Sequence, residues 1–247
     1  MPLPHGQKHN MLNPKVMALA KKMVPSAIYR RLDPFQANID AFVARAAENT
    51  PSGHLVLDVG AGECGFRRLF DHSSYLALDF GLGDPHWDYS GLDVVARCEE
   101  LPLVDGSCDR VLSIVVLEHT PEPARVIGEF CRVLRTGGHV NIVVPHMWEE
   151  HQRPFDYFRY TAGGIRYLLE KAGFKILEIR PVGGFFWQLG RRLIGVLAFT
   201  QQGWRWILFP VLAPLFGLIL PLCCYYLDGL DRDRAYTLGY ICEGLKE

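Results

Sequence analysis

Residues 56–66, with the sequence VLDVGAGECGF, form the stretch of this chain best suited to binding a ligand. Apolar residues lead into Asp58, and glycines follow at Gly60, Gly62 and Gly65. Because glycine has no Cβ, it adopts positive φ easily and lets a ligand lie against the backbone. The free N–H groups and positive dipole end of a following helix would favour an anionic group. The pattern therefore predicts a turn that binds a nucleotide or a carboxylate; the alternative is a tight strand–helix turn without a ligand.

A second group of residues carries side chains that can bind a sugar or move a proton. Asp79 closes another apolar stretch, and a carboxylate at such a strand end can accept hydrogen bonds from two ribose hydroxyls. The segment 146–161, HMWEEHQRPFDYFRYT, follows a later strand, at the edge where doubly wound folds place their ligands. The candidates for a catalytic acid or base in this chain are His119, His151, Asp156 and Tyr157. The alternative for the segment is an ordered loop in which Asp156 pairs with Arg159.

The elements that would position these residues alternate between strands and helices. Strands are expected at 55–59, 75–80, 110–116, 139–144, 174–181 and 236–243, and helices at 64–70, 122–134 and 161–172. Strands separated by helices imply a parallel sheet with helices on both faces. Before them, residues 15–32 resemble an amphipathic helix broken at Pro25. A second helix is expected from Asp33, as N-cap, to about Glu48.

Composition limits the class of protein. The 247 residues suffice for one α/β domain with additions, and a net charge of −1 gives no general attraction to nucleic acid. The seven cysteines show neither CxxC nor Cys/His ligand spacing, so we expect reduced thiols in a cytosolic protein and no metal centre. The start lacks the compact apolar run of a signal peptide. It is basic, with no Asp or Glu before Asp33.

The order of the motifs resembles a known family. The sequence LDVGAGECG is followed by EELPL, DGSCD, RVLSIVVLEHT and RVLRTGGHVNIVVP. This order resembles the class I S-adenosylmethionine-dependent methyltransferases, in the broad group that includes ubiquinone and menaquinone methylating enzymes. The resemblance covers about Leu55 to Pro181. It implies an α/β, doubly wound (Rossmann-like), mostly parallel seven-stranded sheet with an antiparallel last strand, and S-adenosyl-L-methionine as cofactor.

The resemblance also implies roles for individual residues. The expected cofactor-binding positions are Asp58, Gly60, Ala61, Gly62, Gly65, Asp79, Phe80, Cys98, Glu99, Ser113 and Ile114. Asp79 would bind the ribose, and the Cys98–Glu99 backbone would approach the adenine. The family usually has an aspartate two residues before Glu99, where this chain has Arg97, so the adenine contacts stay open. His119 resembles a common structural residue near the cofactor, which is the alternative to a catalytic role.

Residues 184–234 would form an apolar insert before the last strand. From Ile207 to Leu227 there is no charged residue, and the length is near the ~20 residues of a spanning helix. Three prolines interrupt it, and each removes a backbone donor. If the last strand returns beside the strand before the insert, two crossings would need roughly 40 apolar residues. We therefore expect a shallow helical hairpin in one leaflet; the alternative is a cap that buries its apolar face on the protein.

These observations divide the chain into a basic N-terminal helical segment (1–50), a methyltransferase core (51–183 and 235–247) and the insert (184–234). The leading hypothesis is methyl transfer to a small amphipathic or lipid-linked acceptor by a cytoplasmic protein that is peripheral on the membrane, with no nucleic acid involved. The rivals are a nicotinamide-dependent oxidoreductase, a soluble methyltransferase with a substrate lid, and a catalytically silent binding module. The sequence leaves open the acceptor, its reacting atom and the oligomeric state.

Overall fold

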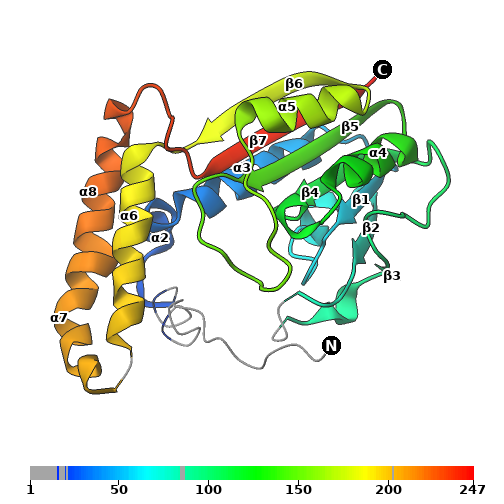
Figure 1. Cartoon of the computed structure of the whole chain (residues 1–247). Coiled ribbons are helices and arrows are strands. Elements are labelled where there is room, and N and C mark those ends of the chain that lie inside the picture. Colours follow the sequence, from blue (N-terminus) through cyan, green and yellow to red (C-terminus); the bar gives the residue numbers. More distant parts are fainter. Residues whose placement is uncertain (1–15, 17–19, 21, 84–86, 202) are drawn as a thin grey trace. The chain divides into compact units, whose positions relative to one another are not determined.

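The computed structural model describes Val16, Ala20 and residues 22–83, 87–201 and 203–247 (Figure 1). Its seven strands are β1 Leu55–Val59, β2 Ser74–Asp79, β3 Val94–Val95, β4 Cys108–Ile114, β5 Leu134–Pro145, β6 Phe174–Val182 and β7 Gly239–Lys246. They form one sheet in the order β3-β2-β1-β4-β5-β7-β6. Neighbouring strands from β3 to β5 run parallel, and β7 is antiparallel to both β5 and β6. The predicted fold class, a mostly parallel seven-stranded sheet with an antiparallel last strand, is confirmed.

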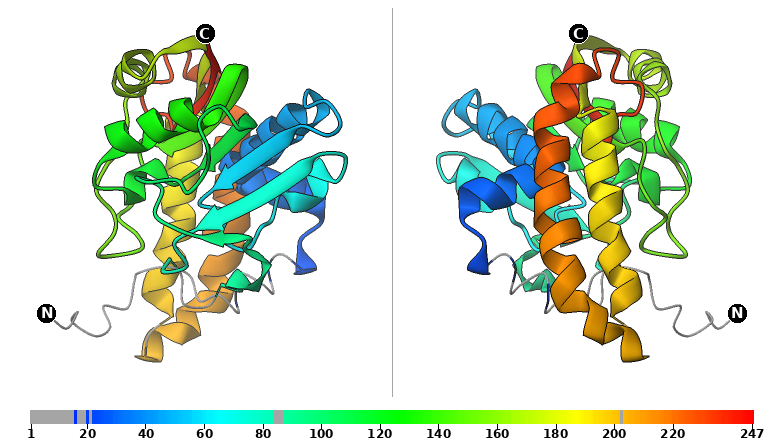
Figure 2. Two further views of the ribbon diagram at one scale, coloured as in Figure 1. Left: turned by 90° about the vertical axis from the view of Figure 1, so that its right-hand side faces the viewer. Right: turned by 90° about the vertical axis from the view of Figure 1, so that its left-hand side faces the viewer.

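Helices cover both faces of the sheet. Helix α3 (Pro34–Glu48) lies on one face, and α4 (Pro123–Val133) and α5 (Ala162–Lys171) lie on the other (Figures 1 and 2). Helix α3 begins where expected, because the backbone N–H of Gln36 donates to the Asp33 carboxylate over 3.2 Å. The side chains between the layers are fully buried and include Val43, Leu57, Val111, Phe130, Ile142 and Ile165. Their removal from water is the main favourable contribution to the fold.

Four local expectations were wrong. The strand expected at 236–243 is β7, Gly239–Lys246, three residues later in the chain. The helix expected at 64–70 is a chain of turns ending in the four-residue 3₁₀ helix η1, Arg67–Phe70, because Gly62 at φ 51° and Cys64 at φ 56° both have left-handed backbone conformations. Strand β5 begins at Leu134 rather than 139: Leu134 pairs with Cys108 of β4, and regular pairing resumes at His139 after a register shift. The two-residue strand β3 has no apolar pattern of its own and was missed.

The described chain divides into two compact units. One combines the described residues up to Ala37 with those of 183–237, and the other combines the described residues of 38–182 with Leu238–Glu247. The second unit holds the sheet. Of the broken helix expected over 15–32, the structure has α2 (Ser26–Leu32) after Pro25, and most of the part before it lies outside the described residues.

The first unit contains a helical hairpin. Its first arm is α6 (Phe185–Val196) with the 3₁₀ turn Leu197–Thr200. Its second arm runs from Gly203 to Leu230 through α7 (Phe209–Pro214), a π-helical stretch (Leu215–Ile219) and α8 (Leu220–Leu227). The two arms lie side by side (Figures 1 and 2). The second arm is long and apolar enough to cross a membrane, with a mean hydropathy of 2.4 over its most apolar 18 residues, of which 11% are buried.

Candidate functional site

The turn after β1 is built around Gly60. Its φ is 81°, and its N–H donates to the carbonyl of Leu78 on the neighbouring strand over 2.8 Å. A Cβ at this position would lie 2.3 Å from Cγ2 of Val116, which is far inside van der Waals contact. Both the conformation and the space therefore require glycine, and the turn presses closely against the end of β4.

Asp79 faces this turn from the end of β2. Its Oδ2 accepts the N–H of Gly62 over 3.0 Å, and its Oδ1 accepts the N–H of Gly81 over 2.7 Å. These two bonds orient a half-buried carboxylate, and each oxygen keeps a second lone pair for a ligand. The sequence predicted this residue beside the turn as the group that binds a ribose, and the orientation fits two vicinal hydroxyls.

Asp58 lies beneath the turn. It is 2% exposed, and the hydroxyl of Tyr75 donates to its carboxylate. Burial raises the pKa of Asp58 to about 6, with a smaller raising effect from Asp79 and opposing effects from Tyr75 and Arg67. Asp58 was expected among the cofactor-binding residues, and Tyr75, which donates a hydrogen bond to it, was not recognised from the sequence.

The expected adenine side has an arrangement of its own. The ring of Phe80 is 45% exposed, and the guanidinium of Arg97 lies over it, 5.5 Å from the ring centre. Arg97 also forms an ion pair with the buried Glu99 at 3.1 Å. Next to this pair is a cavity of about 270 Å³, lined by Arg97, Glu99, Glu100, Pro121, Glu122 and Arg125. Arg97 therefore covers one face of the Phe80 ring, and an adenine that stacked on this face would have to displace Arg97 or stack on its guanidinium.

Other predicted positions lie nearby. Ser113 and Ile114 are the last residues of β4, next to the turn. The Ser113 side chain is fully buried, and its Oγ has no hydrogen-bond partner among the described residues. Trp87 was missed by sequence reasoning: its ring lies 3.0 Å from the place of a Cβ on Gly62. It follows three residues that the structure does not describe, in a loop without a periodic pattern that could have indicated it.

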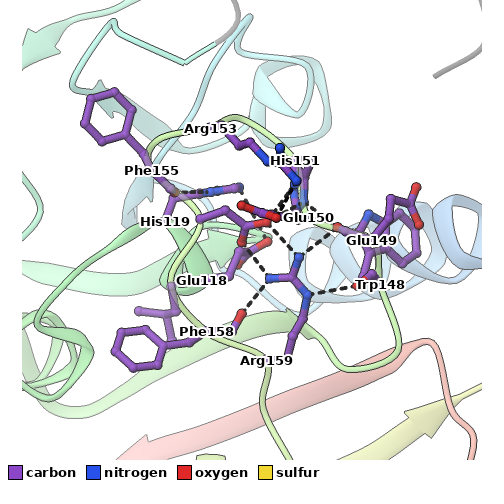
Figure 3. A network of polar contacts seen from close by, with 12 residues as sticks. Glu118, His119, Trp148, Glu149, Glu150, His151, Arg153, Phe155, Phe158 and Arg159 are labelled. Carbon is purple, nitrogen blue, oxygen red and sulfur yellow. Dashed lines mark hydrogen bonds and ion pairs between the residues drawn. The ribbon is translucent and has the colours of Figure 1, made fainter. Parts of the chain in front are cut away.

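A separate polar cluster lies where the loop 146–161 passes the end of β4 (Figure 3). His119 and His151 have ring centres 4.7 Å apart in an edge-on arrangement. Asp156 forms a two-fold ion pair with Arg159, at 2.6 and 2.7 Å, and also accepts the backbone N–H of His151. The structure thus brings together three of the four catalytic candidates. The fourth, Tyr157, has a side chain 46% exposed and contributes its backbone N–H to the carbonyl of Glu118.

Glu118 is the cluster residue that sequence reasoning missed. Its side chain is fully buried, and within the described part of the chain neither carboxylate oxygen has a hydrogen-bond partner. Burial raises the pKa of Glu118 to about 8. Burial likewise lowers the pKa of His119 and the pKa of His151, so both rings favour the neutral form. The position of Glu118 in the sequence LEHT, between an apolar residue and a histidine, did not indicate that its side chain points inward.

Comparison with known proteins identifies the domain around these sites. Residues 57–142 match the family described as "Methyltransferase domain". An uncharacterised methyltransferase of Mycobacterium sp. (strain KMS) is 38% identical over 99 residues, which are 38% of this chain and 39% of that protein. The malonyl-[acyl-carrier protein] O-methyltransferase of Methylococcus capsulatus is 38% identical over 100 residues, 36% of each chain. The matches thus span well under half of these relatives.

A solved structure extends the comparison to the fold. Phosphoethanolamine N-methyltransferase 2 of Haemonchus contortus, in complex with S-adenosyl-L-methionine, superposes with a TM-score of 0.53 and 16% identity, over 85% of this chain and 52% of that one. At this identity the likeness concerns the fold alone. Together with the family match, it shows that residues 57–142 resemble a methyltransferase domain and that the sheet has the fold of S-adenosylmethionine-dependent methyltransferases.

Proposed function

We propose that this protein transfers a methyl group from S-adenosyl-L-methionine to a small amphipathic or lipid-linked acceptor at a membrane surface. The cofactor, when bound, supplies an activated methyl on a sulfonium. The task left to the chain is to hold a nucleophile in line with that methyl and away from water, since proximity and orientation can supply most of the acceleration.

Several residues fit the cofactor. The backbone at Gly60 and Gly62 offers a close approach without side chains, and Asp79 presents an oriented carboxylate to a ribose. Asp58 adds a buried carboxyl group below the turn. The acceptor would enter over the loop 146–161, where His119 and His151 are within reach of a proton if the acceptor is a hydroxyl or a protonated amine.

The apolar arm of the hairpin is the observation that carries the membrane part of the proposal. Its most apolar window is 11% buried, whereas a cap that covered the protein's own core would bury that face. Trp204, Ile207 and Val211 are 77, 75 and 72% exposed. Tryptophan and tyrosine near the ends of such an arm favour the boundary between membrane and water.

Basic residues in the same unit add to the attraction. Helix α2 carries Arg30 and Arg31 in its last turn and lies beside α8. Each Lys or Arg near an anionic lipid surface contributes about 1 kcal/mol. The hairpin and the basic residues together would hold the protein at the cytoplasmic face of a membrane.

Vesicle flotation tests the membrane part. The probes are vesicles of phosphatidylcholine with phosphatidylglycerol, and the variants are Ile207→Asp and Val211→Asp in the hairpin. Val104→Asp and Val95→Asp are matched controls, because these valines are 77 and 71% exposed on the other unit. We expect the native protein and the controls to float and the two hairpin variants to stay at the bottom. Equal flotation of all five proteins, or flotation of none, would refute membrane binding through the hairpin.

Two measurements test the methyltransferase part. Calorimetry should detect stoichiometric binding of S-adenosylhomocysteine. Incubation with methyl-labelled cofactor and a membrane lipid extract should then yield a labelled product that mass spectrometry identifies. The position of Arg97 over Phe80 favours one other function, a catalytically silent binding module. Tight cofactor binding without turnover in lipid and quinone extracts would support that module and reject the enzyme.

A further inference from the structure

The cluster at the end of β4 holds three side chains that a metal ion can bind. One ligand atom from each of Glu118, His119 and His151 lies within 4.8 Å of the others. Two imidazoles and one carboxylate are the ligand set of many zinc and non-haem iron sites. The residues come from two segments more than thirty positions apart, so no spacing motif in the sequence reveals them.

The geometry of His119 suits a metal ligand. Its Nδ1 lies 2.7 Å from the backbone carbonyl of Phe155, which fixes the proton on Nδ1 and leaves a lone pair on Nε2. That Nε2 is buried, has no hydrogen-bond partner within the described residues, and lies 3.7 Å from Oε1 of Glu118. Ligands of one tetrahedral ion at about 2.1 Å lie about 3.4 Å from each other. The pair is therefore already near coordination distance.

His151 is oriented in the same way. Its Nδ1 lies 3.2 Å from the carbonyl of Glu149 and 3.4 Å from Oδ2 of Asp156, so a proton on Nδ1 again leaves Nε2 for a ligand. Metal-bound histidines usually donate their second N–H to a carbonyl or a carboxylate. Both rings in this cluster have that outer support (Figure 3).

The charges around the cluster also favour a cation. Arg159 lies close, but Asp156 neutralises it through the two-fold ion pair. Both oxygens of the fully buried Glu118 side chain lack a hydrogen bond from the described residues, and a buried polar group without a partner is costly. A divalent ion would remove that cost.

We infer that Glu118, His119 and His151 form a site for a divalent transition-metal ion of the Zn²⁺ or Fe²⁺ class. With three protein ligands, the site keeps at least one open position, as in catalytic rather than structural centres. Cysteine spacing had given no reason to expect a metal in this chain, and the inference departs from that expectation.

The metal site itself does not depend on the proposed function, but its role toward an acceptor does. An oxygen bound at the open position loses its proton more easily, since zinc lowers the pKa of bound water to about 7. An acceptor hydroxyl bound there would release its proton to water and become the nucleophile. This role selects an oxygen as the acceptor atom.

Metal binding by the full chain tests the inference. After dialysis against a chelator, the protein is titrated with Zn²⁺ by calorimetry and with Co²⁺ by visible absorption. We expect one ion per chain, and an affinity at least tenfold lower in Glu118→Gln, His119→Gln and His151→Gln. His146→Gln is the matched control: its Nδ1 also lies on a backbone carbonyl, that of Tyr160, and it is outside the cluster. It should bind the ion as the native chain does.

The outcomes separate the inference from the proposed function. Binding of neither ion by the native chain, or equal affinity in the native chain and all three variants, overturns the metal site. If Glu118→Gln fails to fold by circular dichroism, the His151→Gln titration and the native Co²⁺ spectrum decide. Binding of S-adenosylhomocysteine is measured in the same samples, so a metal site without cofactor binding, or the reverse, is recognised as such.

Discussion

The hydroxyl of Tyr75 donates a hydrogen bond to the buried carboxylate of Asp58, across the paired strands β1 and β2. Burial raises the pKa of Asp58 from 3.8 to about 6, so the folded protein holds this proton more tightly than the unfolded chain does. The stabilisation is fully present below about pH 4 and is lost as the pH rises through 6. A shift of about two units corresponds to about 3 kcal/mol.

Replacing Asp58 with Asn removes this pH dependence. Urea unfolding at pH 4 and pH 7.5 should show the native protein losing about 3 kcal/mol more than Asp58→Asn over that range. Any constant cost of the amide cancels in the difference between the two pH values. Parallel stability profiles for the two proteins would contradict the raised pKa.

Replacing Gly60 or Gly53 with alanine compares how much an added Cβ destabilises the protein at two positions. Both have φ near 80°, but a Cβ at Gly53 has nothing within 4 Å, whereas one at Gly60 meets Val116 at 2.3 Å. Gly53→Ala should cost about 1 kcal/mol, the price of a left-handed alanine, and Gly60→Ala about 3 kcal/mol or more. Gly60→Ala should lower the melting temperature less when Val116 is also replaced by alanine than it does in the native protein. Equal melting temperatures for the two alanine variants would show that the turn has room.

Asp79→Asn tests the ribose contact. The amide can accept only one of the two N–H bonds from Gly62 and Gly81, and it loses the charge that strengthens a bond to a hydroxyl. Affinity for S-adenosylhomocysteine in calorimetry should fall about tenfold or more. Asp88→Asn is the control, because Asp88 likewise accepts a backbone N–H, that of Ser90, near the same face. An equal loss of affinity in both variants would show that Asp79 makes no specific contact with the ribose.

Asp228 anchors the base of the hairpin. It is 2% exposed, accepts the N–H groups of Gly184 and Trp187, and forms an ion pair with Arg234 at 2.6 Å. Asp228→Ala leaves these donors unpaired and should lower the stability of this unit by about 3 kcal/mol. Asp228→Asn, which keeps an acceptor, should cost less.

Hydrogen exchange measures this loss of stability at individual backbone amides. The amides of Gly184 and Trp187 should exchange much faster in Asp228→Ala than in the native chain. The exposed Asp233→Asn provides the control and should leave both amides protected. Unchanged protection in Asp228→Ala would mean that other contacts hold the hairpin base.

Most of the sheet could be predicted because its strands are short apolar runs bounded by glycine, proline and aspartate. Where boundaries differed, tertiary pairing decided: Leu134 pairs with Cys108 of β4, so the strand begins there and passes through an irregular stretch with Gly137 and Gly138 before pairing resumes at His139. The two-residue β3 exists only through its pairing with Leu78 and Asp79. A seventh strand was expected only from the family resemblance.

Some residues of the candidate site could likewise be predicted from the sequence, and others could not. Gly60, Gly62 and Asp79 were predictable because a backbone conformation or a strand end requires their residue types. Glu118 and Tyr75 were not, since their importance lies in contacts with residues distant in the chain. Whether a carboxylate points into a protein or into water is decided by which loop folds over it, and here that loop is 146–161.

The pairing of Val182 with Gly239 brings the two ends of the apolar excursion to adjacent places on β6 and β7. In topological terms the whole hairpin is the connection between two neighbouring antiparallel strands, which a β-turn of four residues could also join. A shortened protein that joins these strands through a tight loop should keep the register of every strand. The hairpin could thus be gained, lost or exchanged without changing the sheet. The catalytic domain and the segment proposed to bind a membrane could therefore evolve separately.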